Sequence, residues 1–319
     1  MPCYHPLKAW RSRADGKTPV FNPSLGWRDR PITLPCGQCV GCRLERSRQW
    51  AVRCVHEASL HEDNCFITLT YNNEKLPKDG SLNKKHFQDF MKRLRKKYKN
   101  KKIRYYHCGE YGEQCKNCGQ NKRSCEKTTK CWKPAIGRPH YHAIIFGLDF
   151  ADKQLFNVIN GEKLYTSESL EKVWTDGFST VGSVTFESAA YVARYVMKKV
   201  NGKIAKNHYE RVDVDTGEIY DNIPEYNTMS RRPGIAALWF EKYKDDVYPS
   251  DNIHLRGKTL KPPKFYDRIY EHSNPDEMEK IKLGRMKEMF KHQKDNTPER
   301  LEVKERVKKA SIKKLIRNV

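Results

Sequence analysis

Two histidines stand one residue apart in the apolar stretch GRPHYHAIIFG, residues 137 to 147. Successive side chains of a β-strand point to opposite faces, so His140 and His142 share one face of the strand that this stretch predicts. Burying two imidazoles without partners is costly, and a divalent metal ion is a partner that both rings can bind. The alternative is a pair of structural histidines, hydrogen-bonded at the end of a strand.

A carboxylate in the preceding predicted strand supplies a third ligand. Residues 103 to 112, IRYYHCGEYG, predict that strand, and antiparallel pairing with the histidine strand brings Glu110 beside the imidazoles. Glu113 is the alternative ligand. Two histidines and one carboxylate leave coordination positions open on Mg²⁺ or Mn²⁺, as catalysis on a phosphate requires.

Two tyrosines lie four residues apart in YVARYVMKK, residues 191 to 199, which predicts a helix. At that spacing Tyr191 and Tyr195 share a helix face, and Lys198 and Lys199 add positive charge nearby. Core aromatics are the ordinary interpretation of such a pair. Tyrosine is also a covalent nucleophile, and its attack on a phosphodiester yields a phosphotyrosyl link and a free 3′-OH. The lysines would then orient the phosphate or assist the transfer of the phenol's proton.

The chain has 11 cysteines, and most of them are clustered. A reducing cytosol disfavours disulfides, so clustered cysteines favour metal. Four of them fall within a short segment rich in lysine, asparagine and glycine, which predicts a structural Zn²⁺ knuckle, with free thiols as the alternative. These four are Cys115, Cys118, Cys125 and Cys131.

A second cysteine cluster, Cys36, Cys39 and Cys42, needs a fourth ligand, for which Cys3 and His5 are the candidates. Zinc is one interpretation of this cluster, and an iron–sulfur centre is the other. The isolated cysteines Cys54, Cys65 and Cys108 are expected to be apolar core residues.

The composition indicates a polyanionic partner. The 319 residues include 62 Lys and Arg against 39 Asp and Glu, a formal net charge of +23, and 37% are hydrophobic. This apolar content suffices for one sizeable core or two small ones. Phosphate backbone is the polyanion that such a charge favours. Neither a membrane-spanning run nor a signal peptide is recognisable, so we expect a cytosolic protein.

The expected elements lie in the order helix, strand, helix, two strands, helix, strand and helix, which predicts an α+β fold with helices on a largely antiparallel sheet. They are residues 43–61, 64–72, 83–99, 103–112, 140–147, 170–176, 179–186 and 187–200. Residues 1–35 are expected to be irregular, 212–221 to form a hairpin, and helices to start at 275 and 298. The basic run 84–104 is either a solvated helix face or a DNA contact.

Three motifs, FITLTYN, GRPHYHAIIFG and YVARYVMKK, resemble in order and spacing those of the HUH superfamily of rolling-circle replication initiators. The paired tyrosines resemble its two-tyrosine branch. LPCGQCVGCRLERSRQWAVRCVHEA, HFQDFMKRLRKKY, HCGEYGE and MSRRPGIAALWFEKY are similar to the gokushovirus replication initiation proteins of the Microviridae.

This resemblance implies a phage endonuclease of the host bacterial cytoplasm, with an HUH-type antiparallel sheet. It implies that His140 and His142 bind the metal, and that Tyr191 and Tyr195 nick origin DNA, leaving a 5′-phosphotyrosine and a 3′-OH, and later rejoin the ends. A host helicase and DNA polymerase are the expected partners.

The expected domains are a Cys-rich segment and helix (1–62), an endonuclease core (63–205) carrying the insert 115–131, a family-specific region packed on that core (206–272) and a basic helical tail (273–319). Two other functions remain open from the residues alone. One is a zinc-dependent DNA-binding protein without catalysis, and the other is an RNA-binding regulator.

Overall fold

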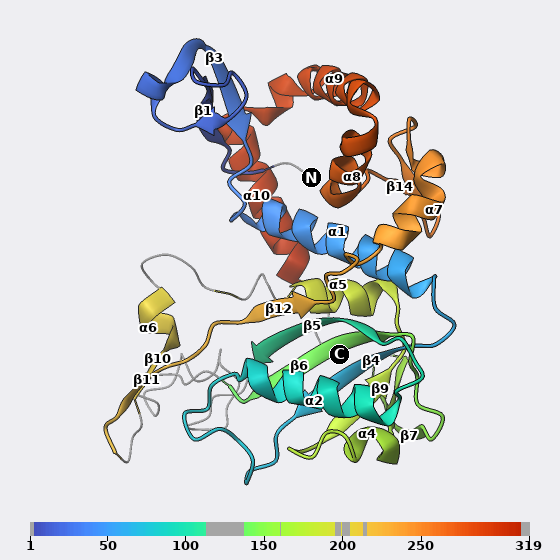
Figure 1. Ribbon diagram of the computed structural model, residues 1–319. Helices are drawn as coiled ribbons and strands as arrows, with labels where there is room; N and C mark the ends of the chain where they lie inside the picture. The colour runs from blue at the N-terminus through green and yellow to red at the C-terminus, as the bar shows by residue number, and fades with distance from the viewer. Residues whose placement is uncertain are drawn as a thin grey trace. The chain divides into compact units, whose positions relative to one another are not determined.

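The computed structural model describes residues 3–112, 137–159, 161–194, 199, 205–212 and 216–313 (Figure 1). The described residues form two compact units. One contains the residues up to Ser47 together with those from Asp267 onward, and the other contains the residues between Arg48 and Tyr266. Among the described helices, none is long and apolar enough to cross a membrane.

The larger unit is built on an antiparallel sheet with the strand order β12-β5-β6-β4-β9-β8-β7. Its strands are β4 (Asn64–Thr70), β5 (Arg104–Tyr111), β6 (Pro139–Phe146), β7 (Gln154–Ile159), β8 (Glu162–Thr166), β9 (Ser179–Gly182) and β12 (Tyr226–Met229). The histidine strand β6 lies between β5 and β4, which explains why it is apolar on both faces. The predicted α+β class with an antiparallel sheet is confirmed.

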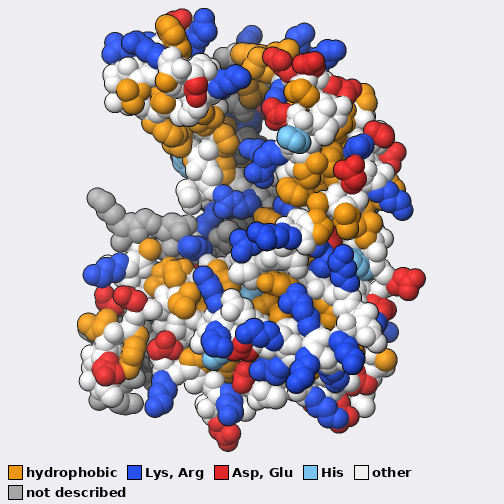
Figure 2. Space-filling model, viewed as in Figure 1, with side chains coloured by type: hydrophobic (Ala, Val, Ile, Leu, Met, Phe, Trp, Pro, Cys, Tyr) orange, Lys and Arg blue, Asp and Glu red, His pale blue; other side chains and the backbone are white. Residues whose placement is uncertain are grey.

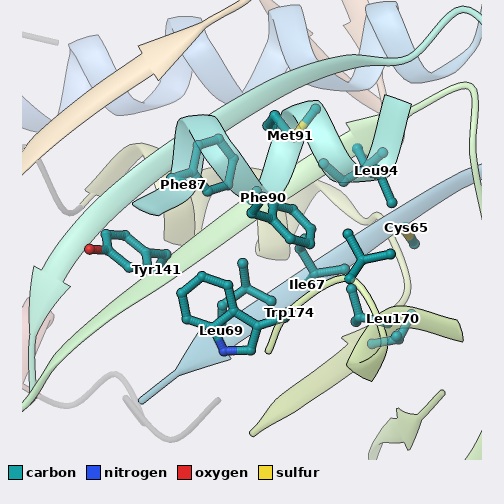
Figure 3. Packing of buried hydrophobic residues seen from close by; sticks show 14 of the residues in the cluster. Cys65, Ile67, Leu69, Phe87, Phe90, Met91, Leu94, Tyr141, Leu170 and Trp174 are labelled. Carbon is teal, nitrogen blue, oxygen red and sulfur yellow. The ribbon is translucent and has the colours of Figure 1, made fainter. Parts of the chain in front are cut away.

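One face of this sheet is covered by α2 (Lys84–Lys97), whose first turn is capped by the Asn83 side chain. The buried stripe of α2, at helical spacing, packs on alternate residues of β4 and β6. Figure 3 shows this core, in which Trp174 also lies against the sheet and donates from Nε1 to the carbonyl of Thr70 at 2.9 Å. The members of the stripe are Phe87, Phe90, Met91 and Leu94.

The opposite face of the sheet is covered by α5 (Phe186–Arg194) and by the second half of α1 (Val40–Ala58). The ring of Trp50 in α1 stacks on that of Tyr106 in β5, with the centroids 4.8 Å apart. Because side chains alternate along β5, this face is the one that carries Glu110.

A buried ion pair fixes α1 to the start of β5. The Glu57 carboxylate accepts hydrogen bonds from the Arg104 guanidinium and from the backbone N–H of Ala236. Arg104 also donates to the carbonyl of Pro233 at 2.8 Å. One pair therefore joins a helix, a strand and the loop of the MSRRPGIAALWFEKY motif.

The other elements of the larger unit are small. They are α4 (Glu168–Glu171), α6 (Ala205–Tyr209), β10 (Glu210–Val212), β11 (Ile219–Asp221), α7 (Ala237–Val247), β13 (Ile253–Leu255) and β14 (Lys258–Leu260). β10 and β11 pair antiparallel, so the hairpin predicted at 212–221 is confirmed, with its first strand starting at Glu210.

The smaller unit combines the two ends of the described chain. It contains β1 (Leu7–Ser12), β2 (Pro19–Val20), η1 (Pro23–Leu25), β3 (Gly26–Leu34), the start of α1, α9 (Pro275–Lys291), η3 (Gln293–Asn296) and α10 (Pro298–Lys313). α8 (Lys264–Ser273) runs from the larger unit into it. Both helices predicted from proline at the first turn are confirmed.

The expectation for residues 1–35 is wrong, and two other expected elements have different bounds in the structure. Residues 1–35 are not irregular but form the sheet β2-β1-β3, whose strands are mostly exposed and so lack an apolar alternation. The short helix expected at 170–176 is α4, which starts at Glu168 because Ser167 caps it. The strand expected at 179–186 ends at Gly182, and β7, β8 and β12 were not predicted.

Candidate active site

Glu110, His140 and His142 converge on the sheet face opposite α2. β5 and β6 pair antiparallel, as predicted, with Glu110 opposite His140 and Cys108 opposite His142. Oε1 of Glu110 lies 2.6 Å from Nε2 of His140 and 3.0 Å from Nε2 of His142. The register therefore brings all three side chains to one point.

The other ring nitrogen of each histidine is held by a second group. Nδ1 of His140 lies 3.1 Å from the carbonyl oxygen of Arg138, and Nδ1 of His142 lies 2.9 Å from Oγ1 of Thr68 on β4. A carbonyl only accepts, so His140 donates from Nδ1 and, when neutral, has a lone pair on Nε2. The contact of Nε2 with a carboxylate oxygen then needs either a second proton on the ring or a cation.

The Glu110 carboxylate is ionised despite its burial, with 2% of the residue exposed. Burial by itself raises the pKa of this carboxyl, but the charge of His140 and the hydrogen bonds from both histidines outweigh it and hold the pKa well below its usual range. The site therefore offers one anionic oxygen and two imidazole nitrogens.

This donor set fits a divalent metal ion. The three ligand atoms lie within 4.8 Å of one another. Neighbouring ligands of an octahedral ion at about 2.1 Å are about 3 Å apart, close to the separations of Oε1 from the two Nε2 atoms. Histidines that bind metals are usually held through their second nitrogen, as both are here.

Of the two tyrosines expected as nucleophiles, Tyr191 is among the described residues, and it lies at this site. α5 positions it so that its ring and that of His142 are in an edge-to-face arrangement, with centroids 5.2 Å apart and planes at 81°. It also lies edge-on to Phe66, at 6.3 Å. Lys199 is half-buried. Tyr195 and Lys198 lie outside the described residues.

The insert also lies outside the described residues. Glu113, the alternative ligand, and the predicted zinc knuckle belong to residues 113–136, of which no structure is described. The cysteines of that knuckle are Cys115, Cys118, Cys125 and Cys131.

In the smaller unit, Cys3, Cys36, Cys39 and Cys42 converge, with their sulfurs within 4.8 Å of one another. Sγ of Cys39 lies 3.9 Å from Sγ of Cys3, far longer than the roughly 2.05 Å of a disulfide. Two thiolates on a tetrahedral ion at about 2.3 Å are about 3.8 Å apart. The geometry fits a four-sulfur metal site.

Backbone N–H groups point at these sulfurs, as thiolate ligands require. Cys36 donates to Sγ of Cys3 at 3.2 Å, and Tyr4 donates to Sγ of Cys39 at 3.4 Å. Burial opposes ionisation of Cys39, but the N–H groups of Cys42 and Tyr4 lower its pKa to about 6. Burial and the neighbouring thiols Cys3 and Cys39 raise the pKa of Cys42 to about 12, so without a metal ion the negative charge of the cluster lies on Cys39.

The structure brings Cys3 rather than His5 into this cluster. Nε2 of His5 lies 2.9 Å from Oε2 of Glu305 in α10. Leu301, also in α10, packs with Tyr4 and Cys39 in the small core around the sulfurs. The C-terminal helix is therefore part of the same folded unit as the cysteines.

Sequence reasoning missed Thr68 and the Arg138 carbonyl. Thr68 stands in the FITLTYN motif, on the side of β4 that faces away from α2, and pairs with His142. A hydroxyl between apolar strand residues was the signal that could have located it.

The comparisons with known proteins agree on one family. A family model described as "Replication-associated protein ORF2/G2P" matches residues 64–118 and 131–200. Replication-associated protein VP4 of Bdellovibrio phage phiMH2K is 32% identical over 286 residues, 86% of this chain and 79% of the relative. Replication-associated protein ORF2 of Spiroplasma virus 4 is 32% identical over 258 residues, 77% of this chain and 70% of the relative.

Replication-associated protein ORF4 of Chlamydia phage 1 is 34% identical over 174 residues, 52% of this chain and 38% of the relative. No solved structure matches the chain significantly. The identities and the coverage of the first two relatives show that the chain belongs to the family of gokushovirus-type phage replication-associated proteins, the replication initiators of these phages.

Proposed function

We propose that this replication initiator is a DNA endonuclease and strand transferase of the HUH two-tyrosine type, which nicks the phage origin and later rejoins the ends. The observation that carries the proposal is the convergence of Nε2 of His140 and His142 on Glu110, with the ring of Tyr191 against His142. A histidine pair that only stabilises the fold does not require a tyrosine from a later helix beside it.

Glu110, His140 and His142 would hold Mg²⁺ or Mn²⁺ through one oxygen and two nitrogens. Such an ion, when bound, polarises the scissile phosphate and offsets negative charge in the transition state. Thr68 and the Arg138 carbonyl fix the two rings, so both Nε2 atoms remain directed at one point.

Tyr191 or Tyr195 is the nucleophile. The phenol loses its proton, its oxygen attacks the phosphorus, and the bond to the 3′ oxygen breaks. The leaving oxygen takes up a proton, so the products are a 5′-phosphotyrosine and a 3′-OH. Lys198 or Lys199 orients the phosphate or assists the proton's departure. After one round the second tyrosine cleaves the regenerated origin, and the new 3′-OH attacks the first phosphotyrosine and closes a circle.

The partners follow from these products. Origin DNA is engaged as a single strand at the nick, and the 3′-OH primes a host polymerase behind a host helicase, in the bacterial cytoplasm. We assign the nuclease chemistry to a core at residues 63–205.

Zinc is the metal that we propose for the four-sulfur site. Four thiolates with N–H···S hydrogen bonds suit Zn²⁺ or an iron–sulfur centre, and the proposed chemistry has no redox step for the latter to serve. A second structural zinc at the cysteines of the insert, residues 115–131, is proposed on their spacing alone.

The test is incubation of single-stranded origin DNA with the protein and Mn²⁺, followed by denaturing electrophoresis. A covalent protein–DNA adduct is expected, and Tyr191→Phe combined with Tyr195→Phe removes it. The single variants show which tyrosine cuts first, and Tyr243→Phe in α7 is a control for the same chemical change. DNA left uncut across several origin sequences and divalent metals would instead support a non-catalytic DNA-binding protein.

A further inference from the structure

A cavity of about 290 Å³ lies on the other face of the sheet, between α2 and the edge strand β12. Aromatic side chains from three elements line it, Phe87 from α2, Tyr105 and His107 from β5, and Tyr226 from β12. Small-molecule sites start at about 300 Å³, so the cavity suits one flat ring system rather than a large ligand.

Two polar atoms of residues that line this cavity, Nε2 of His107 and the hydroxyl oxygen of Tyr226, are buried and have no hydrogen-bond partner within the described part of the chain. His107 is 1% exposed, its ring stacks on Phe87 with centroids 3.4 Å apart, and its Nδ1 lies 2.9 Å from Oγ1 of Thr228. An unpaired buried polar atom is costly, so each of these two atoms calls for an explanation.

Both groups are neutral and able to hydrogen-bond with an uncharged partner. Burial lowers the pKa of His107 well below its usual range, with the charge of His142 acting in the same direction. Burial likewise raises the pKa of the Tyr226 phenol, so its hydroxyl remains a donor. The described residues that line the cavity therefore combine aromatic rings with uncharged donors and acceptors, and the charged residues among them are Lys84 and Arg231.

The rim of the cavity is positive. Nζ of Lys84 lies 4.9 Å from the centroid of the Tyr226 ring, and Arg231 also lines the cavity. Lys84 and Arg231 are both exposed. Figure 2 shows lysine and arginine side chains gathered over the surface where α2 lies in Figure 1. A ligand with a flat, uncharged ring and an attached phosphate matches this arrangement.

We propose that the cavity binds one base of single-stranded DNA, a few nucleotides away from the scissile phosphate, with the neighbouring phosphates on Lys84 and Arg231. This inference rests on the proposed function. The base stacks on the half-buried ring of Tyr105 or Tyr226, and its polar edge meets the unpaired atoms of His107 and Tyr226 once these buried groups turn toward it.

The sheet topology makes such a path short. Tyr226 pairs with Gly109, the residue before Glu110, and β12 is the edge strand of the sheet. A DNA strand that passes around this edge therefore reaches Glu110 on one face and the cavity on the other. The cavity then anchors the flanking strand and sets the register of the nick.

The experiment uses a set of single-stranded origin oligonucleotides, each with one base removed at a different position. The equilibrium binding affinity of the protein for each oligonucleotide is measured at a fixed salt concentration. For the wild-type protein we expect one position near the nick at which loss of the base weakens binding about tenfold. Gln88→Trp, at an exposed residue that lines the cavity, fills it. In this variant the intact oligonucleotide should bind as weakly as the abasic one, so the penalty disappears.

Lys96→Trp is the matched control, because Lys96 is exposed on α2 and does not line the cavity. It should keep the abasic penalty. Lys84→Ala and Lys96→Ala test the contribution of charge, because each removes one lysine from α2. Lys84→Ala is expected to weaken oligonucleotide binding more than Lys96→Ala. The proposal is overturned if Gln88→Trp leaves every abasic penalty unchanged, or if free deoxynucleoside monophosphates compete as well as the oligonucleotide.

The covalent adduct, measured on the same samples, separates this inference from the proposed nuclease. In one outcome, the covalent adduct forms while Gln88→Trp leaves every abasic penalty in binding unchanged. That result overturns the cavity assignment and leaves the proposed nuclease activity intact. Loss of one penalty in Gln88→Trp, with no adduct from any protein, supports the base-binding cavity and contradicts the nuclease.

Discussion

Glu110 and His140 are cross-strand partners, directly opposite each other on β5 and β6, and Oε1 of the first lies 2.6 Å from Nε2 of the second. A shift of the register by one residue would move either side chain to the α2 face of the sheet. The candidate metal site therefore depends on the same strand pairing that builds the core.

Substitution of Glu110 should abolish binding of Mn²⁺. A divalent ion at 100 times its dissociation constant should stabilise the folded wild-type protein by about 2.7 kcal/mol, seen as a rise in unfolding temperature with added metal. Glu110→Gln removes the anionic oxygen, so we expect no rise. Glu113→Gln is the control, and the ligand assignment is wrong if that variant loses the effect while Glu110→Gln retains it.

Thr68→Val should weaken metal binding without removing a ligand. The Thr68 hydroxyl holds Nδ1 of His142, and loss of such a supporting hydrogen bond typically costs 10- to 100-fold in metal affinity. Thr70→Val is matched, because Thr70 lies in the same strand but its hydroxyl donates to the Phe178 carbonyl. Titration calorimetry with Mn²⁺ compares the two, and equal affinities would contradict the role of Thr68.

Removal of zinc should unfold the smaller unit. Strong chelators should lower the unfolding temperature, because metal bound only by the folded state adds its binding free energy to stability. Cys3→Ser should reduce the measured zinc content by one ion per chain, whereas His5→Ala should not. If His5→Ala loses the ion and Cys3→Ser keeps it, the fourth ligand is misassigned.

Glu57→Gln should destabilise the larger unit by about 3 kcal/mol, because it leaves the buried Arg104 without its counter-charge. Glu241→Gln, in an exposed pair with Lys244, should leave stability unchanged. Denaturant unfolding at pH 7 measures both variants. Equal stabilities would show that the buried pair contributes nothing.

The effect of Glu57→Gln should also depend on pH. Burial raises the pKa of Glu57, but its hydrogen bonds with His61 and Ala236 and the charge of Arg104 lower it below the usual 4.5. A lowered folded-state pKa contributes stability that is complete above 4.5 and is lost as the pH falls through the folded value. The difference between wild type and Glu57→Gln should therefore shrink below pH 4.5, and a constant difference would contradict this linkage.

Local patterns were sufficient for the elements with strong periodicity. Residues close together in the chain determine the period or the cap of each of these elements. They are the apolar stripe of α2, the two-sided apolar run of β6 and the proline starts of α9 and α10. β1 to β3, β7 and β8 carry no such signal, because their strands are largely exposed and pair mainly with one another.

The sequence by itself determined which residue types stand at the site and, through alternation along a strand, that His140 and His142 share a face. The sequence predicted Glu110 beside them on the assumption of antiparallel pairing, and only the tertiary structure decided that pairing and its register. The antiparallel register placed Glu110 at both Nε2 atoms, and α5 brought Tyr191 to His142. The folding of α10 onto the cysteines joined the two ends of the described chain. Such contacts link residues that are far apart in the chain, so no local periodicity in the sequence predicts them.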